Sequence, residues 1–213
     1  MAPVGTTTHR TETVDCGGGR TFGMGVVAVG EFDGELRRLV LDLKYRNRRR
    51  TARSLALLMS NLLPADADVI TWAPTSTARR RRRGFDHAEL IARHVASMHG
   101  ARWLHALRRL DDAGQTGRDR AERMVGPVFE ASGAVRGLHV VVVDDVVTTG
   151  ATLRAAAVAL HRAGALRVTG VCAASVGGHY PRRHGNRPSQ DEHETHVGRE
   201  DPREGDRGDR EGR

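Results

Sequence analysis

The sequence predicts an α/β fold in which a mainly parallel sheet is flanked by helices, a Rossmann-like arrangement. Helical and strand patterns alternate along the chain, which is typical of parallel strands joined by crossover helices. Residues 140–143 are four consecutive valines, as expected of a central strand that helices cover on both faces. The length of 213 residues suits one three-layer core and is short for two.

The individual elements follow from the spacing of apolar residues. Four helices are expected from apolar residues at helical spacing. The first has Leu36, Leu39, Val40 and Leu43, and the second has Leu55, Leu58, Met59 and Leu62. The third, at 88–98, has Leu90, Ile91 and Val95, and the last, which ends near Gly164, has Leu153, Ala156, Ala157 and Leu160. The expected strands carry Val69, Ile70 and Trp72 in the first, the valines at 140–143 in the second, and residues 166–174 in the third. The Met and aromatic residues on these faces are assigned to the core.

The two ends of the chain differ in composition from its middle. Residues 178–213 are rich in Arg, Asp, Glu and His and have almost no aliphatic side chains, so they cannot bury enough apolar surface to offset the entropy of ordering. Residues 1–22 are polar and rich in glycine. We therefore predict a poorly ordered N-terminal segment at 1–22, a folded domain at 23–177 and a disordered charged tail at 178–213.

Charge, cysteine content and hydropathy limit the class of protein. The net charge is +8 and the excess of basic residues precedes the tail, but nearly all are Arg, with Lys44 the only lysine. Because GC-rich coding also favours Arg, this charge alone does not indicate a nucleic-acid partner. Cys16 and Cys172 are too few for a disulfide framework or a zinc site. No apolar run is long enough to span a membrane and no signal peptide is apparent, so we expect a cytoplasmic protein.

The stretch VVVVDDVVTTGATL, from Val140 to Leu153, predicts a site for a phosphorylated sugar. Strand side chains alternate between faces, so the adjacent carboxylates of Asp144 and Asp145 leave the strand in different directions and need separate partners. Carboxylates accept hydrogen bonds from vicinal hydroxyls. The free N–H groups of a helix start bind phosphate, and the residues at this start are Thr148, Thr149, Gly150, Ala151 and Thr152. The alternative is a strand that ends in solvated aspartates before an ordinary helix.

Other phosphate-binding motifs do not fit this sequence. The pattern GxxxxGK[ST] is absent, and the glycines at 17–19, 23 and 25 do not form GxGxxG between a strand and a helix. Ribose 5-phosphate, which has a phosphate at one end and a diol at the other, is the shape of ligand that the stretch predicts.

This stretch resembles the phosphoribosyl pyrophosphate (PRPP) signature of type I phosphoribosyltransferases. Further segments resemble the ComF branch of that family, named for competence protein F: LKYRNRR at 43–49, RRGFDHAELIAR at 82–93, residues 115–123 and Phe129. The resemblance covers about residues 30–175. It implies PRPP as substrate or ligand, with Mg²⁺ held mainly through PRPP and few direct protein ligands, and no covalent nucleophile. Asp144 and Asp145 would be the catalytic residues, which orient the diol and stabilise the positive charge that develops on the ribose.

A second candidate segment follows the strand that begins at Val69. Thr75 and Ser76 lead into five consecutive arginines, 79–83, which we interpret as a loop. Ligands of open α/β sheets bind at the carboxyl ends of the strands, and guanidinium groups pair with phosphate oxygens. The resemblance implies that this loop binds the pyrophosphate of PRPP, and the candidates are Thr75, Ser76, Arg79 and Arg83. A solvated basic loop and a DNA-contacting patch are the alternatives.

A third segment, 111–126, is polar and contains glycine, and we interpret it as a flexible lid. Type I phosphoribosyltransferases close a loop at this place over PRPP, which excludes water from a reactive intermediate. Gln115, Arg118 and Arg123 are the candidates for ligand contact. Arg123 is equally suited to anchor the segment that follows.

The sequence departs from the family pattern at three places. Thr148 stands where purine-salvage relatives usually have an aspartate, and it cannot accept a proton from hypoxanthine or guanine, which leaves orotate or an amine open as acceptor. The cysteines of the usual N-terminal zinc ribbon are missing apart from Cys16, so no zinc is expected. Asp86 and His87 replace the usual Asn-Gln, and a carboxylate there is an unfavourable neighbour for pyrophosphate unless metal or arginine compensates.

Two functions follow from these patterns. The first is Mg²⁺-dependent phosphoribosyl transfer from PRPP to an unidentified acceptor. The second is a non-catalytic accessory role in competence or DNA uptake, with a nucleotide or single-stranded DNA bound near the arginines at 79–83. An aromatic content of 4% argues against stacking platforms for single-stranded DNA. Either function is compatible with a homo-oligomer.

Overall fold

The computed structural model describes residues 7–45, 49–110 and 126–176, and it confirms the predicted α/β fold. The described helices are α1 (Gly34–Tyr45), α2 (Arg50–Ser60), α3 (Thr77–Arg83), α4 (His87–His99) and α5 (Ala151–Arg162), with a 3-10 turn η2 (Gly133–Val135). The described strands are β1 (Thr8–Gly17), β2 (Arg20–Glu31), β3 (Val69–Trp72), β4 (Arg102–Trp103), β5 (Leu107–Arg109), β6 (Phe129–Ala131), β7 (His139–Val147) and β8 (Arg167–Ser175). None of these helices is long and apolar enough to cross a membrane.

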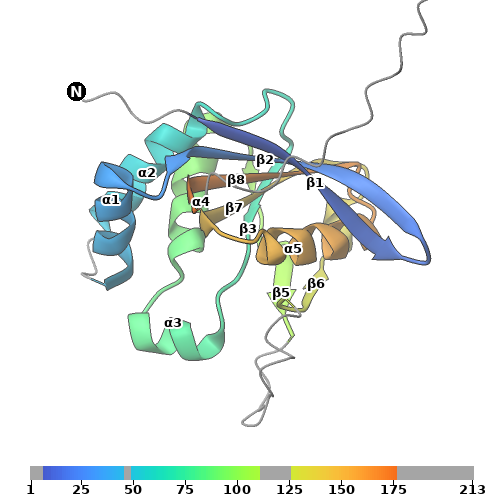
Figure 1. Ribbon diagram of the computed structural model, residues 1–213. Coiled ribbons are helices and arrows are strands. Elements are labelled where there is room, and N and C mark those ends of the chain that lie inside the picture. The colour runs from blue at the N-terminus through green and yellow to red at the C-terminus, as the bar shows by residue number, and fades with distance from the viewer. Residues whose placement is uncertain (1–6, 46–48, 111–125, 177–213) are drawn as a thin grey trace, which may run out of the picture. The chain divides into compact units, whose positions relative to one another are not determined.

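The main sheet has the strand order β1-β2-β8-β7-β3-β4, and every pairing in it except β1 with β2 is parallel (Figure 1). Its middle strand β7 has a core on each face. Val140 and Val142 pack in one apolar cluster with side chains of α5, and Val141 and Val143 pack in a second cluster with α1, α2 and α4. The valine run is therefore fully buried, as a central parallel strand requires.

The N-terminal segment is ordered where the structure describes it, so the prediction of a poorly ordered stretch at 1–22 is wrong from residue 7 onward. β1 and β2 form an antiparallel hairpin, and β2 continues into the main sheet beside β8. Inward-facing Val14 and Met24 are buried, while the polar residues beside Val14 and the glycines beside Met24 are exposed. The polar composition that suggested disorder is the outer face of this hairpin. The predicted tail at 178–213 lies outside the described residues.

The arginine segment is a helix, not the loop that the sequence suggested. The side chain of Ser76 accepts a hydrogen bond from the N–H of Arg79 at the start of α3, and Gly84 ends the helix with a φ of 79°. None of the α3 residues is buried. The helix therefore stands on the surface with its arginines fixed at helical spacing, and two of them turn toward the sheet.

Two further differences affect the site. β7 extends to Val147, so Asp144 and Asp145 lie within the strand, and Asp144 pairs with Cys172 of β8, whereas the sequence suggested that the strand ends before them. The short strands β5 and β6, which the sequence did not predict, form a separate antiparallel pair. This pair carries Arg109 toward the carboxyl ends of β3 and β7.

Candidate functional site

A polar cavity of about 200 Å³ lies at the carboxyl ends of β3 and β7. It is lined by Lys44, Ala73, Pro74, Thr75, Arg79, Arg83, Asp86, His87, Ala88, Arg109, Asp144, Asp145, Val146 and Thr152. Two segments that the sequence singled out separately, 75–83 and 144–152, therefore meet in one place. Six of the predicted site residues are in this lining: Thr75, Arg79, Arg83, Asp144, Asp145 and Thr152.

The two adjacent carboxylates have different partners because they project from opposite faces of β7. Asp145 faces α1, where its Oδ1 lies 2.8 Å from Nζ of Lys44, and the two side chains are only 14% and 19% exposed. Asp144 Oδ1 accepts a hydrogen bond of 2.8 Å from the N–H of Asp145. The only lysine of the chain is thus the counter-ion of one carboxylate of the pair.

The environment of Asp144 favours its protonated form. Loss of hydration and the neighbouring Asp145 carboxylate raise the pKa of Asp144 to about 8. Asp144 therefore holds its proton more readily than an ordinary aspartate, while Asp145 keeps its ion pair with Lys44.

The loop between β7 and α5 is held by the N-terminal hairpin. Gly150 has a φ of 76°, and a Cβ atom there would lie 2.9 Å from Arg10 Nη2 and 3.0 Å from Arg154 Nη1. Arg154 bonds both Glu12 Oε2 and the carbonyl of Thr149, each at 2.8 Å. The left-handed backbone favours glycine, and a larger residue would also displace the ends of these arginine side chains. The start of α5 is therefore in contact with β1, a connection that the sequence prediction missed because it treated the N-terminus as poorly ordered.

The remaining predicted phosphate-binding residues surround this turn but do not line the cavity. The side chains of Thr148 and Thr149 are exposed, and Thr149 Oγ1 accepts a hydrogen bond of 3.4 Å from the N–H of Ala151. Ala151 borders a different cavity, described below. Their assignment to a 5′-phosphate stays a prediction.

Asp86 has a structural role that explains its presence beside the arginines. It is 5% exposed, its Oδ2 accepts a hydrogen bond of 2.8 Å from the N–H of Thr75, and its Oδ1 accepts from the N–H groups of Ala88 and Glu89. It therefore caps α4 and holds the loop after β3. Burial raises the pKa of Asp86, while these three N–H groups oppose that rise. The sequence suggested an unfavourable carboxylate next to an anion, but these N–H groups already compensate its oxygens.

Three cavity residues were missed as site residues by the sequence prediction: Lys44, His87 and Arg109. The signal for Lys44 was its uniqueness in a chain otherwise rich in Arg, and the signal for His87 was its departure from the family pattern. Arg109 carried no signal, because β5 is a short strand without an apolar pattern. Ser76 caps α3 and is not in the cavity lining, so its assignment to ligand binding stays a prediction. The lid residues Gln115, Arg118 and Arg123 lie outside the described residues.

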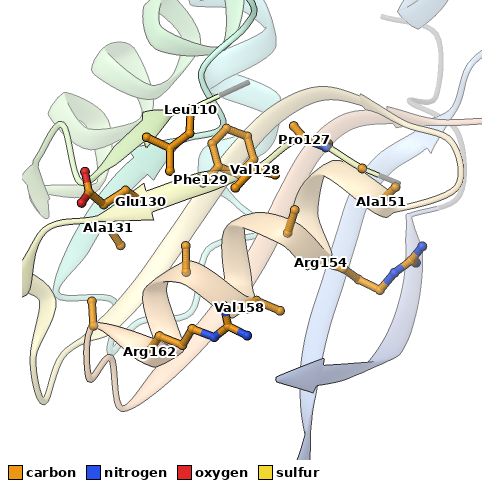
Figure 2. Close-up of a pocket in the computed structure, with 14 residues that line it drawn as sticks. Leu110, Pro127, Val128, Phe129, Glu130, Ala131, Ala151, Arg154, Val158 and Arg162 are labelled. Carbon is orange, nitrogen blue, oxygen red and sulfur yellow. The ribbon is translucent and has the colours of Figure 1, made fainter. Parts of the chain in front are cut away.

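A second cavity, of about 750 Å³, lies between α5 and the segment around β6 (Figure 2). Its walls are mainly apolar and include Leu110, Val128, Phe129 and Val158, while Arg154 extends from it toward the N-terminal strands. It lacks the paired carboxylates of the smaller cavity. The polar cavity is thus the better candidate for a charged ligand.

No group of three or more His, Cys, Asp or Glu side chains in the described part of the chain could hold a metal ion. The carboxylates that line the polar cavity are Asp86, Asp144 and Asp145. Asp86 already accepts from three backbone N–H groups, and Asp145 is paired with Lys44. A Mg²⁺ ion here would fit only if a bound ligand and water supplied most of its oxygens, which is common for this ion.

Comparison with known proteins shows the class of fold to which this chain belongs. A family model described as a phosphoribosyl transferase domain matches residues 83–197. Together with the parallel sheet, this match confirms the type I phosphoribosyltransferase fold. Solved structures that are similar include glutamine PRPP amidotransferase from B. subtilis, at 23% identity over 62% of this chain and 30% of that one with a TM-score of 0.46. Another is a purine phosphoribosyltransferase from Pyrococcus horikoshii, at 19% identity over 66% of this chain and 73% of that one with a TM-score of 0.38.

Curated relatives define the branch. DNA utilization protein YhgH of Salmonella typhi is 32% identical over 159 residues, which cover 69% of this chain and 70% of that protein. YhgH of Escherichia coli K12 is 32% identical over 167 residues, with the same shares covered. Competence protein ComFC of Bacillus subtilis is 31% identical over 100 residues, which cover 46% of this chain and 40% of that protein. The chain therefore belongs to the ComF family of type I phosphoribosyltransferase-like proteins, as its motifs predicted.

Proposed function

We propose that this protein binds PRPP together with Mg²⁺ and transfers the phosphoribosyl group to an acceptor. The family match indicates a ribose phosphate as ligand. The observation that supports the proposal most is the polar cavity, where the carboxylates of β7, two arginines of α3 and Thr152 of α5 face one space. A diol, a pyrophosphate and a phosphate are the groups that suit these three sets of side chains.

The charges of the cavity suit a strongly anionic ligand. Lys44, Arg79, Arg83 and Arg109 contribute four cationic groups to its lining. Against them stand Asp145, the capping Asp86 and Asp144, whose raised pKa lowers its negative charge before a ligand binds. We assign the pyrophosphate to Thr75, Arg79 and Arg83, the ribose hydroxyls to Asp144 and Asp145, and the 5′-phosphate to residues 148–152.

In the proposed reaction, the bond between the anomeric carbon and pyrophosphate breaks, and its electron pair leaves with the pyrophosphate. The acceptor then forms the new bond to this carbon with its own lone pair and loses a proton if it carried one. Mg²⁺ would neutralise the leaving pyrophosphate. The carboxylates of Asp144 and Asp145 hold the ribose hydroxyls and stabilise the positive charge on the sugar ring. Thr148 cannot act as a base. The acceptor in this proposal is therefore one that does not depend on deprotonation by residue 148.

Calorimetric titration with PRPP and Mg²⁺ tests the sugar site. The wild-type protein should bind, and Asp144→Asn combined with Asp145→Asn should abolish binding, because the amides lose the charge that the ribose and metal require. Asp33→Asn is the matched control, since Asp33 is exposed and lies outside the cavity. Unchanged affinity in the double variant would contradict the assignment of the ribose.

A search for the acceptor uses release of pyrophosphate from PRPP as its signal. Nucleobases and amines are tested separately, each with the wild-type protein and with the double variant. Release that depends on both the acceptor and the carboxylates would establish the transferase. Tight PRPP binding without release from any acceptor would favour the accessory role.

The exposed arginines of α3 favour one second function, binding of single-stranded DNA in an accessory role. Arg79 and Arg83 line the polar cavity, whereas Arg80 and Arg81 do not, and no α3 residue is buried. Relatives are named for DNA utilization and competence. If α3 contacts DNA, replacing Arg80 and Arg81 by Ser should weaken salt-dependent DNA binding and leave PRPP affinity unchanged. Replacing Arg79 and Arg83 should lower PRPP affinity.

A further inference from the structure

His87, the first residue of α4, presents a buried imidazole at the polar cavity. It is 3% exposed and belongs to the cavity lining. Its ring meets the Phe85 ring edge-on, at a centroid distance of 4.8 Å and an interplanar angle of 88°. Its Nδ1 lies 3.2 Å from Nη1 of Arg83. The ring is therefore held between an aromatic side chain and a guanidinium group.

The contact with Arg83 fixes the tautomer of this ring. A guanidinium group can only donate hydrogen bonds, so Nδ1 of His87 must accept, and the proton of the neutral ring is on Nε2. Burial and the Arg83 guanidinium lower the pKa of His87 to about 4. The ring is thus neutral at physiological pH and offers one N–H donor, at Nε2.

This donor has no partner among the residues that the structure describes. His87 Nε2 is buried without a hydrogen bond, and so is Nε of Arg83 on the side chain that contacts it. Buried donors are normally paired, since an unpaired one loses its hydration without compensation. Because both atoms are donors, the partner that would satisfy them is an acceptor. Lys44 and Arg79 in the same lining add positive charge, which favours an oxyanion over a neutral acceptor.

We propose that the Nε2–H of His87, positioned by Arg83, binds a non-bridging oxygen of the pyrophosphate group of PRPP. This assignment rests on the proposed function and adds a ligand-binding residue to it. In the proposed function the carboxylates of Asp144 and Asp145 accept hydrogen bonds from the ribose hydroxyls. An oxyanion such as pyrophosphate requires hydrogen-bond donors instead. The His87 ring thus extends the arginine side of the cavity by one neutral donor.

Calorimetry with three probes in the presence of Mg²⁺ tests the proposal: PRPP, ribose 5-phosphate and inorganic pyrophosphate. His87→Phe keeps a planar ring and removes the donor, and His87→Gln keeps an N–H donor. His87→Phe should lower the affinity for PRPP and pyrophosphate about tenfold, the usual effect of one hydrogen bond to a charged group. The affinity for ribose 5-phosphate should not change, and His87→Gln should bind PRPP nearly as the wild type does.

Several outcomes would overturn this proposal. Wild-type PRPP affinity in His87→Phe, or an equal loss for PRPP and ribose 5-phosphate, would remove His87 from the pyrophosphate site while the proposed function stands. Binding of neither PRPP nor pyrophosphate by the wild-type protein would overturn both together.

A measurement on the wild-type protein covers the case in which His87→Phe does not fold. Nitrogen-15 NMR of the imidazole should show the Nε2–H tautomer between pH 5.5 and 8, about the range where the ring is neutral. The Nε2–H signal should shift on addition of PRPP with Mg²⁺ and not on addition of ribose 5-phosphate. A proton on Nδ1, or a signal that PRPP leaves unmoved, would contradict the proposal.

Discussion

Asp144 and Asp145 are adjacent in the chain, yet the strand geometry gives them opposite electrostatic roles. Asp145 is paired with Lys44 across the α1 side of the sheet, while Asp144 accepts a hydrogen bond from the backbone N–H of Asp145 and faces the charge of its neighbour. Burial and the neighbouring carboxylate both favour the protonated form of Asp144.

The raised pKa of Asp144 predicts how stability depends on pH. Between the ordinary value of 3.8 and about 8, the folded protein binds more protons at this site than the unfolded chain does. The free energy of unfolding should therefore fall as pH rises through this window. Asp144→Asn removes this loss and should be more stable than the wild type at pH 8, on the order of 2 kcal/mol after screening by water.

Urea unfolding at pH 5, 6.5 and 8 measures this effect. The wild type and Asp144→Asn should differ least at pH 5 and most at pH 8. Asp33→Asn, at an exposed position, should follow the wild type throughout. Parallel pH profiles for the wild type and Asp144→Asn would show that Asp144 ionises normally in the folded protein.

Lys44 permits a second prediction at the residue scale because it is the only lysine of the chain. Lys44 and the N-terminal amine are the only primary amines that an acetylating reagent can modify, and Lys44 is 19% exposed beside Asp145. Bound PRPP with Mg²⁺ should cover it. At ten times the dissociation constant, labelling of Lys44 should slow about tenfold, since roughly one site in eleven is free. Mass spectrometry of peptides measures the rate, and the N-terminal amine is the internal control. Equal labelling with and without PRPP would separate Lys44 from the ligand.

At the scale of elements, Asp86 joins three parts of the site. It caps α4, holds the backbone of Thr75 after β3, and follows α3 after only Gly84 and Phe85. Asp86→Ala should lower the free energy of unfolding by about 1–2 kcal/mol, the usual cost of a lost cap. It should also weaken PRPP binding, because Thr75 loses its anchor. Asp86→Asn retains a capping oxygen and should lose less than half of this stability.

Guanidinium unfolding and PRPP calorimetry on the two variants check this prediction. Ser132→Ala is the matched control, because Ser132 caps the short turn η2 away from the cavity and should affect stability only slightly and binding not at all. A loss of stability without any loss of PRPP affinity in Asp86→Ala would mean that the Thr75 backbone does not need this anchor.

The elements differ in how well the sequence predicted them. The central strand and the helices that cover it have strong apolar patterns, and they were predicted because burial on a known face determines those patterns. The helix α3 was not predicted, since five arginines have no apolar period; its helix depends on the cap at Ser76, the left-handed Gly84 and the high helix propensity of Arg. Similarly, β1 alternates polar and buried residues so sparsely that its composition resembles a disordered segment.

The candidate site was predicted where a motif is contiguous and missed where tertiary contacts assemble it. Asp144, Asp145 and Thr152 come from one stretch, and parallel topology alone brings Thr75, Arg79 and Arg83 beside them. Lys44 arrives from α1 and Arg109 from β5, and no local pattern of the sequence relates either residue to β7. Only the packing of α1 on the sheet reveals that Asp145 has a cationic partner.

On the scale of the molecule, the edge strand β1 supports the motif at 140–153, although the two lie far apart in the sequence. β1 is the first strand, yet its Arg10 and Glu12 pack against Gly150 and Arg154 at the start of α5. The two residues lie more than a hundred positions from the motif in sequence. The N-terminal hairpin therefore contributes both core residues and the rigidity of the predicted phosphate-binding turn.

Deletion of residues 2–17 should accordingly damage both stability and binding. The deletion removes Val14, which is 1% exposed, and leaves the edge of β2 unpaired. A loss of several kcal/mol is expected, since burial of one valine alone contributes roughly 1.5–3 kcal/mol.

Deletion of 178–213, predicted to be disordered, should shift the melting temperature by less than about 2 °C, because few buried contacts are lost. Calorimetric melting of the two shortened proteins separates these effects.

Glu12→Gln, which keeps the strand and weakens the ion pairs with Arg10 and Arg154, should lower PRPP affinity with a small change in melting temperature. If Glu12→Gln binds PRPP like the wild type while the deletion of 2–17 unfolds the protein, β1 supports the fold without holding the phosphate turn.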